Sequence, residues 1–204
     1  MAPLPMIYWL WDAWVVSWVI AAIWSARATA HPPVWSEIWR DALALTGSII
    51  LFGFSAPEVI PQDGPLAGVQ AMMLAPLWRA PTPAAWGLVG LTAVGLAFCW
   101  WARLHLGRLW SSFVGRKAEH RVVDTGPYRL VRHPIYTGLL TALLAMALAK
   151  GTAAALVGLL LAIAGFWLKA RLEERFLRAE LGVELYDAYS RRTPMLLPLA
   201  PRLG

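Results

Sequence analysis

Charged residues and cysteine are both scarce in this sequence of 204 residues. Only 15% of the residues are Asp, Glu, Lys or Arg and 59% are hydrophobic, whereas a typical soluble domain has about 25% charged residues. This deficit of charge, together with several long apolar runs, excludes an ordinary soluble domain and predicts an all-α integral membrane protein. The single cysteine, Cys99, excludes an intramolecular disulfide framework.

The N-terminal segment also lacks the basic stretch that precedes the apolar run of a cleavable signal peptide. We therefore expect its apolar run to be retained as a membrane helix. Apolar runs cover so much of the chain that little is left for a soluble domain. Residues 1–204 are accordingly expected to form a single membrane domain.

Five apolar runs are expected to form transmembrane helices, at residues 7–26, 42–60, 84–101, 135–149 and 152–168. The second is expected to bend or end near Pro57, because proline removes a backbone donor. Between the spans we expect a polar connector at residues 31–41 and a short helix within residues 66–77 at the outer interface.

The last two runs predict a C-terminal helical hairpin. Lys150-Gly151 between them is typical of a tight turn on the outer side. The second helix of the hairpin is expected to continue past the lipid through Glu173 and Glu174 to Leu181, where Gly182 ends it.

Basic residues are concentrated in two parts of the chain. Of the eighteen Lys and Arg, seven lie between Arg103 and Arg132 and seven between Lys169 and Arg202. The positive-inside rule places both parts in the cytoplasm, so five spans would put the N-terminus outside and the C-terminus inside. The net charge of +6 is compatible with nucleic-acid binding, but its segregation favours membrane topology, in a cell inner membrane or an endomembrane.

Residues 124–138 bring polar chemistry next to the apolar runs. These fifteen residues contain two each of Gly, Pro, Tyr and Arg, and one His. Polar and ionisable residues at a membrane usually have a function. If both hairpin segments are helical, a rise of about 1.5 Å per residue puts Glu173 and Glu174 roughly 8–9 Å above Pro134. A space bounded by His133, Tyr136 and these carboxylates could then hold a small ligand.

The residues around this space predict a ligand that carries charges of both signs. Pro134 suits the first position of a helix. The free backbone N–H groups of that first turn, with Arg132 beside them, favour an anionic group, and the two glutamates favour a cationic one. S-adenosylmethionine carries a carboxylate, an ammonium and a sulfonium and fits both. The four histidines lack zinc-site spacing, so no metal is expected.

A series of short motifs runs through the second half of the chain: Leu106-Gly107, Trp110-Ser111, Gly126-Pro-Tyr-Arg129, Arg132-His-Pro-Ile-Tyr-Thr-Gly138 and Glu173-Glu174, followed by Gly182, Tyr186, Tyr189 and Pro194-Met-Leu-Leu-Pro198. These motifs resemble the isoprenylcysteine carboxyl methyltransferase family and its bacterial and archaeal relatives, which are kin to the phospholipid N-methyltransferases. The resemblance covers residues 103–198, which would form a methyltransferase core after three spans in residues 1–102.

The resemblance implies an S-adenosylmethionine-dependent methyltransferase with a cofactor pocket at the cytoplasmic face. By motif match, the residues at this pocket would be Tyr128, His133, Pro134, Tyr136, Gly138 and Glu173. Arg132 and Glu174 match positions that the family needs at the reacting centre. Arg132 would anchor a substrate carboxylate, and Glu174 could serve as a base for an amine. The substrate would be a lipophilic or prenylated molecule, with an isoprenylcysteine carboxylate as the implied acceptor, entering laterally from the membrane lipid.

Other functions stay open from the sequence. One is N-methylation of a phospholipid or another amine, and a second is an NADPH-dependent membrane reductase, because sterol reductases carry a similar Arg-His-x-x-Tyr-x-Gly element. A third is a non-catalytic membrane protein that binds lipid or a partner. Glu174 and Arg178, four residues apart, could also form a simple surface pair. Arg129 and Arg132 could bind lipid headgroups, and His133 could be only a helix cap.

Overall fold

Helices form the regular secondary structure of the part of the chain that the computed structural model describes, residues 2–22, 34–53, 67–107 and 123–198. The α-helices within these ranges are α1 (Pro3–Ala22), α2 (Val34–Gly53), α3 (Ala67–Leu74), α4 (Thr82–Leu106), α5 (Pro134–Lys150), α6 (Ala153–Leu181) and α7 (Val183–Arg192). A short 3-10 helix, η3 (Gly126–Arg129), precedes α5. The prediction of an all-α protein is confirmed for these ranges.

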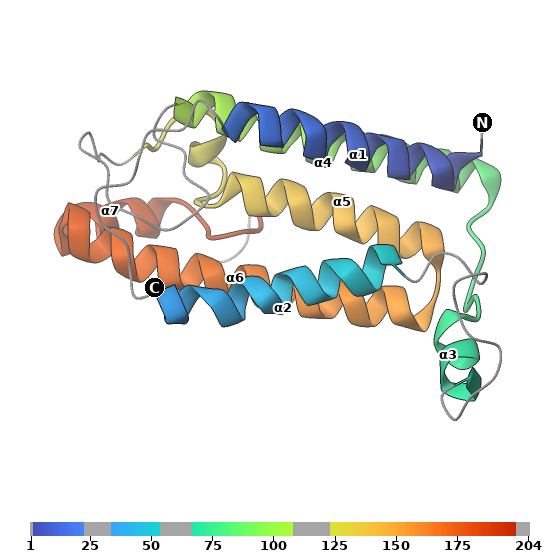
Figure 1. Ribbon diagram of the computed structural model, residues 1–204. Helices are drawn as coiled ribbons and strands as arrows, with labels where there is room; N and C mark the ends of the chain where they lie inside the picture. Colours follow the sequence, from blue (N-terminus) through green and yellow to red (C-terminus); the bar gives the residue numbers. More distant parts are fainter. Residues whose placement is uncertain (1, 23–33, 54–66, 108–122, 199–204) are drawn as a thin grey trace.

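The long helices lie side by side in an elongated bundle (Figure 1). Helix α1 packs along α4, α4 along α5, and α2 along α6, while α5 and α6 form the predicted hairpin. The N-terminal end of α1 and helix α7 lie at opposite ends of the bundle (Figure 1). The end at which α5 begins, α6 ends and α7 lies is termed the polar end below.

Three of the helices are long and apolar enough to cross a membrane: α1, α4 and α6. The apolar part of α2 (Asp41–Gly53) and helix α5 are shorter. Each of the five predicted spans thus corresponds to a helix, and three of these have the length and composition of a full crossing. The three long apolar helices identify the chain as an integral membrane protein.

Several helix boundaries differ from the predicted ones. Helix α2 already begins at Val34, so the prediction of a polar connector at residues 31–41 is wrong from that residue onward. Helix α4 extends beyond its apolar run to Leu106 and ends at Gly107, whose φ is 55°. An apolar run marks the part of a helix suited to lipid, whereas the helix itself continues through polar residues until a stop signal. Helix α7 was not predicted, and Pro57 lies outside the described residues.

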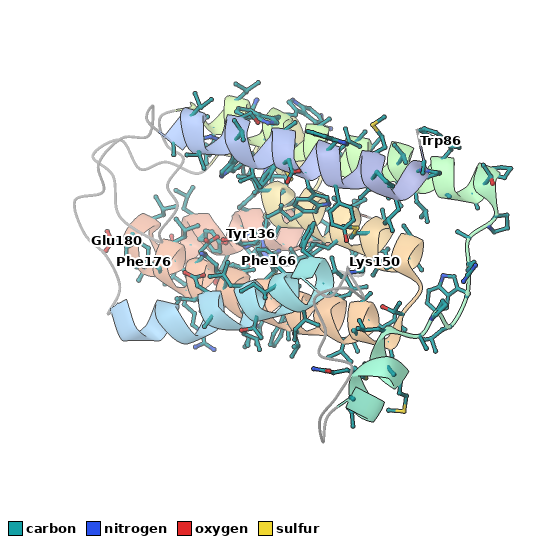
Figure 2. All side chains as sticks on the ribbon, turned by 45° about the vertical axis from the view of Figure 1, so that its right-hand side comes forward. Trp86, Tyr136, Lys150, Phe166, Phe176 and Glu180 are labelled. Carbon is teal, nitrogen blue, oxygen red and sulfur yellow. The ribbon has the colours of Figure 1, made fainter. Side chains whose placement is uncertain are left out.

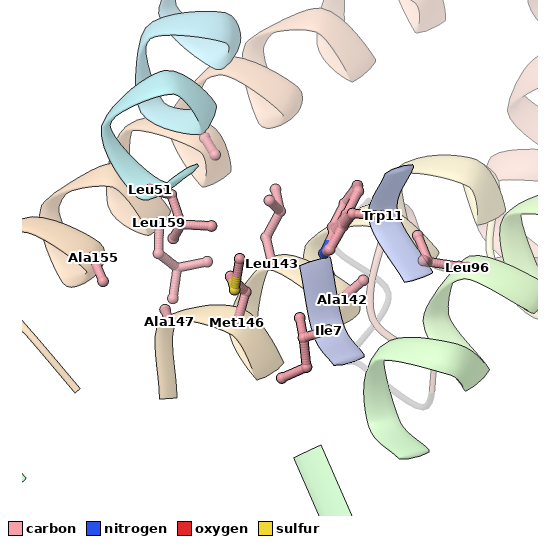
Figure 3. Close-up of a cluster of buried hydrophobic side chains, with 11 residues drawn as sticks. Ile7, Trp11, Leu51, Leu96, Ala142, Leu143, Met146, Ala147, Ala155 and Leu159 are labelled. Atoms are coloured by element: carbon pink, nitrogen blue, oxygen red, sulfur yellow. The ribbon is translucent and has the colours of Figure 1, made fainter. Parts of the chain in front are cut away.

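A buried apolar cluster holds the middle of the bundle together (Figure 3). It takes side chains from five helices, among them Ile7, Trp11, Leu51, Leu96, Met146 and Leu159. Lipid is as apolar as these side chains, so packing rather than exclusion of water drives their association within the membrane. This cluster fixes the relative positions of α5 and α6, the two helices that carry the polar motifs.

Small residues allow two pairs of helices to approach closely near the polar end. A Cβ added to Gly95 of α4 would lie 2.6 Å from the carbonyl oxygen of Gly138 in α5. A Cβ added to Gly165 of α6 would lie 2.6 Å from the backbone nitrogen of Ala44 in α2. Such contacts are typical of helix packing in membranes. They hold α4 against α5, and α2 against α6.

Candidate active site

The two arms of the α5–α6 hairpin are joined at the polar end by charged and polar side chains. Arg132 Nε lies 2.7 Å from Glu174 Oε1. His133 lies between both carboxylates, with Nδ1 3.2 Å from Glu173 Oε2 and Nε2 3.3 Å from Glu174 Oε1. The hydroxyl of Tyr136 donates to Glu173 Oε1. These five residues, termed the charged cluster, bring together motifs that are about forty residues apart in the sequence.

Local structure explains how the hairpin presents these residues. Pro134 is the first residue of α5, where its missing N–H is not needed, and it is fully buried. Arg132 and His133 therefore lie on the approach to the helix, and Tyr136 lies in its first turn. On the other arm, two adjacent helical positions carry the glutamates and differ by about 100° in direction. Glu173 can therefore reach Nδ1 of His133 while Glu174 reaches Nε2.

Aromatic rings form the apolar side of the charged cluster. The rings of His133 and Tyr136 are stacked, with centroids 5.5 Å apart and planes 6° from parallel. Tyr136 also packs on Phe166 of α6, at 5.2 Å between ring centroids. Figure 2 shows Tyr136 and Phe166 together in the interior between the helices. The ring of Tyr136 is therefore held by its neighbours while its hydroxyl bonds to the carboxylate.

The charges within the cluster balance each other. Burial disfavours the protonated form of His133 and lowers its pKa. Hydrogen bonds to Glu173 and Glu174, and the negative charges of both, outweigh this effect and raise the pKa above its ordinary value of 6.5. With His133 protonated, two cations face two carboxylates. The glutamates are thus partnered from within the protein, a feature that the sequence did not predict.

The chain that follows α7 covers the start of α5. Residues 193–196, termed the C-terminal strap, run beside it. The backbone N–H of Arg132 donates to the carbonyl oxygen of Pro194 at 2.8 Å, and that of His133 donates to the carbonyl oxygen of Met195 at 3.1 Å. Donors at the approach to the helix are therefore used by the chain itself. Both donors precede the first turn of α5, for whose N–H groups an anion site was predicted, so that site stays a prediction.

The guanidinium of Arg132 joins the strap to the hairpin. Its Nη1 donates to the carbonyl oxygen of Ser190 at 2.9 Å and to that of Thr193, while Nε donates to Glu174. Only Nη2 makes no hydrogen bond to a described residue. The Arg132 side chain is 10% exposed, so it bonds mainly within the protein, and the alternative in which it only binds lipid headgroups does not account for these contacts.

Tyr128 lies beside the cluster in η3. Its carbonyl oxygen accepts a hydrogen bond of 2.7 Å from the hydroxyl of Tyr189 in α7. Burial raises the pKa of Tyr128, and the negative charge of Glu173 adds to this rise. Burial likewise raises the pKa of Tyr189. Both phenols are therefore protonated at physiological pH, and together they anchor α7 on the polar end.

Gly138 is the predicted site residue that the structure does not bring to the charged cluster. It is buried one turn further along α5 and faces α4, where an added Cβ would lie 2.6 Å from Cys99 Sγ. Its small size therefore serves the α4–α5 contact. Its part in a cofactor pocket is still a prediction from the motif.

Direct contacts replace the space that the sequence predicted between the hairpin arms. The estimate from helix rise considered backbones alone, whereas the side chains of Tyr136 and Glu173 are long enough to meet. The alternative of a simple surface pair between Glu174 and Arg178 is not what the structure has. Glu174 pairs with Arg132, and Arg178 pairs with Asp187 of α7 at 2.7 Å.

The cluster still has capacity for a ligand with charges of both signs. Each carboxylate oxygen of Glu173 has one hydrogen-bond or ion-pair partner among the described residues, and a carboxylate oxygen can accept two. Glu173 is also the more exposed glutamate, at 23% against 14% for Glu174. Glu173 can therefore receive a cationic group, and Arg132 Nη2 can receive an anionic one.

A metal centre was not expected from the sequence. Among the residues that the structure describes, no group of three or more His, Cys, Asp or Glu is arranged to hold a metal ion. Two of the four histidines, His31 and His120, lie outside the described residues, as does the motif Trp110-Ser111.

The long apolar helices and the charged cluster at one end of the bundle define a helical membrane protein with a polar site at its edge. Residues 88–179 match the model of the isoprenylcysteine carboxyl methyltransferase family. The matched segment contains α5 and the parts of α4 and α6 that pack against it, together with the whole charged cluster. The match bears out, over this segment, the resemblance seen in the motifs.

The chain is also similar to the cobalt-zinc-cadmium resistance protein CzcN of Cupriavidus metallidurans. It is 26% identical to this chain over 163 residues, which is 79% of this chain and 62% of that protein. The chain therefore spans less than two thirds of the length of this relative. The similarity covers more residues than the family match, so it includes part of the chain outside residues 88–179.

Proposed function

We propose that this protein is an S-adenosylmethionine-dependent methyltransferase that esterifies the carboxylate of a lipophilic, isoprenylcysteine-like acceptor at the membrane surface. The observation that carries the proposal is the direct joining of Arg132 and His133 to Glu173 and Glu174 at the polar end. Four ionisable groups from distant parts of the sequence meet there beside apolar helices. Desolvating such groups is unfavourable, so their assembly argues for a function beyond folding.

The cofactor is assigned to the side of the cluster formed by Glu173. S-adenosylmethionine, when bound, supplies a methyl group that its sulfonium activates for transfer. Glu173 would hold the ammonium through its remaining lone pairs, while His133 and Tyr136 fix the direction of the carboxylate. Tyr128 would lie nearby, and Pro134 and Gly138 are assigned to the pocket by the motif.

The acceptor is assigned to the side formed by Arg132. Its Nη2 would bind the acceptor carboxylate, while Nε and Nη1 stay bonded to Glu174 and to the strap. An ionised carboxylate is already a nucleophile and needs no base. Glu174 Oε1 is already shared by Arg132 and His133, so only Oε2 would be open to a proton from an amine, whereas a carboxylate acceptor uses neither oxygen. This favours O-methylation over N-methylation.

The membrane arrangement follows from the same assignment. The predicted five spans would place the polar end in the cytoplasm and the N-terminus outside, within one membrane domain. Helices near the site expose large apolar side chains, among them Leu104 at 65% and Trp101 at 48%. The tail of an acceptor would lie along such lipid-facing surfaces while its carboxylate reaches Arg132. Water would be excluded by the buried aromatic residues and by the strap.

A transfer assay tests the proposal. The protein in lipid nanodiscs is supplied with S-adenosylmethionine labelled in its methyl group and with either a prenylated cysteine or an aminophospholipid. We expect label in the prenylated cysteine, released as methanol by mild base because the product is an ester. Base-stable label in the aminophospholipid would support N-methylation instead. No transfer to either acceptor, with binding of NADPH, would contradict the proposal.

A further inference from the structure

We propose that Asp41 of α2 is a positioning residue for this site. It holds the ammonium of Lys169 away from Glu173, which keeps Glu173 open to a cationic ligand group. The inference rests on the proposed cofactor site and extends it into the first half of the chain, which carries none of the family motifs and lies mostly outside the family match.

The ion pair lies between α2 and α6, one turn from the charged cluster. Lys169 Nζ is 2.7 Å from Asp41 Oδ1, and the two side chains are only 15% and 27% exposed. Lys169 precedes Glu173 by four residues in α6. Side chains at this spacing lie on the same face of a helix and commonly pair when their charges are opposite. Here Lys169 turns to α2 instead, and Glu173 bonds to His133 and Tyr136.

Close contacts between α2 and α6, which begin one turn from the ion pair, favour this choice of partner. One turn from Lys169, a Cβ on Gly165 would lie 2.6 Å from the backbone nitrogen of Ala44, which is one turn from Asp41. About two turns from Gly165 along α6, a Cβ on Gly158 would lie 2.7 Å from the carbonyl oxygen of Gly47. The two backbones are thus in close contact over several turns, which holds the backbones of Asp41 and Lys169 within reach of an ion pair.

The charge of Asp41 also reaches the charged cluster. It acts electrostatically on the phenol of Tyr136, which donates its hydrogen bond to Glu173. The negative charge of Asp41 compensates the positive charge of Lys169. The two cations and the two carboxylates of the charged cluster then compensate each other. Without that charge, the ammonium of Lys169 would become an additional cation four residues from Glu173. It would compete for the carboxylate and repel a sulfonium or ammonium.

Binding measurements on the full-length protein in nanodiscs test this inference. Titration calorimetry gives the Kd of S-adenosylmethionine and of S-adenosylhomocysteine, which lacks the sulfonium charge. We expect Asp41→Asn to weaken S-adenosylmethionine about tenfold, the effect of a unit charge several ångströms away, and to weaken S-adenosylhomocysteine less. Lys169→Met is expected to leave binding of S-adenosylmethionine unchanged or tighter, and the double variant is expected to restore the affinity lost in Asp41→Asn.

The opposite behaviour of the two single variants distinguishes positioning from simple packing. An ion pair that only stabilised the fold would give similar losses in both, and for both ligands. Asp187→Asn, which breaks the more exposed pair with Arg178, is the matched control and is expected to leave both Kd values unchanged. Loss of affinity in Lys169→Met, or no rescue in the double variant, would overturn the inference. A wild-type protein that binds neither ligand would overturn the proposed function itself and this inference with it.

Discussion

The two ends of the α5–α6 hairpin are held by different kinds of contact. At the turn, Gly151 adopts the left-handed conformation, with φ 61°, and its N–H donates to the carbonyl oxygen of Ala147 at 2.9 Å. Thr152 caps α6 by accepting from the N–H of Ala155. Trp78, from the segment after α3, donates its indole N–H to the carbonyl oxygen of Leu148 at 2.9 Å. These bonds all join uncharged groups.

At the open end, ionised side chains join the same two helices. Arg132 and His133 bond to Glu173 and Glu174, and the strap is bonded to the same arm through backbone and guanidinium donors. At the turn end the chain itself joins the two helices, and the charged group there, Lys150, donates to the carbonyl oxygen of Leu51 in α2 and not across the hairpin. The charged residues of the open end are not needed merely to bring two helices together, which is why we assign the function to this end.

Among substitutions at the two ends, Arg132→Ala at the open end is expected to have the largest effect on methyl transfer and on stability. This change leaves Glu174 with His133 as its only described partner and removes two bonds to the chain near the strap. Breaking a buried ion pair costs about 3–5 kcal/mol, and we expect methyl transfer to fall more than about a hundredfold. Binding of S-adenosylhomocysteine should weaken less. Thermal unfolding and transfer assays measure these effects.

The control for that change is Arg178→Ala, whose side chain is 52% exposed. It should cost at most about 1 kcal/mol, as is typical of surface pairs, and leave transfer intact. Equal effects of the two substitutions would mean that the charged cluster is an ordinary surface network.

A substitution at the turn end should affect stability alone. Gly151→Ala forces a residue with a Cβ into the left-handed region, at a cost of about 1–2 kcal/mol, and adds a clash, because the Cβ would collide with the carbonyl oxygen of Trp78. We expect a lower Tm with an unchanged Kd for S-adenosylhomocysteine. Gly87→Ala, where a Cβ meets nothing within 4 Å, is the control and should not lower Tm. A change of Kd in Gly151→Ala would show that the two ends are coupled.

A smaller effect is expected where α7 is anchored at the open end. Tyr189→Phe removes the hydrogen bond to the carbonyl oxygen of Tyr128, which is worth about 1 kcal/mol. We expect a modest loss of Tm, with KM for the cofactor rising more than kcat falls. Tyr186→Phe should change less, because the hydroxyl of Tyr186 makes no hydrogen bond to a described residue. A larger loss for Tyr186→Phe would place the anchor of α7 elsewhere.

The smallest effect is expected from pH. The pKa of His133 is raised above 6.5 in the folded protein, so protonated His133 contributes its full stabilisation below that pH. The contribution is lost as the pH rises through the raised pKa. Between about pH 6 and pH 9, a range that spans histidine titration, Tm should fall in the wild type relative to His133→Gln. Parallel curves would mean that the pKa of His133 is the same in the folded and unfolded states, and a relative rise in the wild type would mean that His133 is neutral in the folded state.

The turn of the hairpin and the end of its second helix could be predicted from sequence because their signals are local. Lys150-Gly151 between two apolar runs was sufficient to predict the turn, and Gly182 to predict the end of α6. The pairing of the open end was predicted only in part. The lengths of the helices correctly predicted that the two arms end at the same side of the bundle. The predicted gap between Tyr136 and Glu173 is absent, because the rise per residue does not include the length of the side chains, which meet.

Contacts between distant segments could not be predicted at all. No local pattern indicates that Asp41 pairs with Lys169, because the sequence placed Asp41 in a connector and the pairing depends on how α2 packs on α6. The same holds for the strap, whose carbonyl oxygens reach Arg132 only after α7 has folded back. Backbone carbonyl groups occur in every residue, so a sequence carries no signal for which of them will bind.

The most direct measurement is a titration of S-adenosylmethionine into the full-length protein in nanodiscs, compared with Glu173→Gln and Gly151→Ala. A cofactor site at the open end predicts saturable binding to the wild type, at least about tenfold weaker binding to Glu173→Gln, and unchanged binding to Gly151→Ala. Equal affinity of the wild type and Glu173→Gln, or binding of NADPH in place of S-adenosylmethionine, would contradict the account.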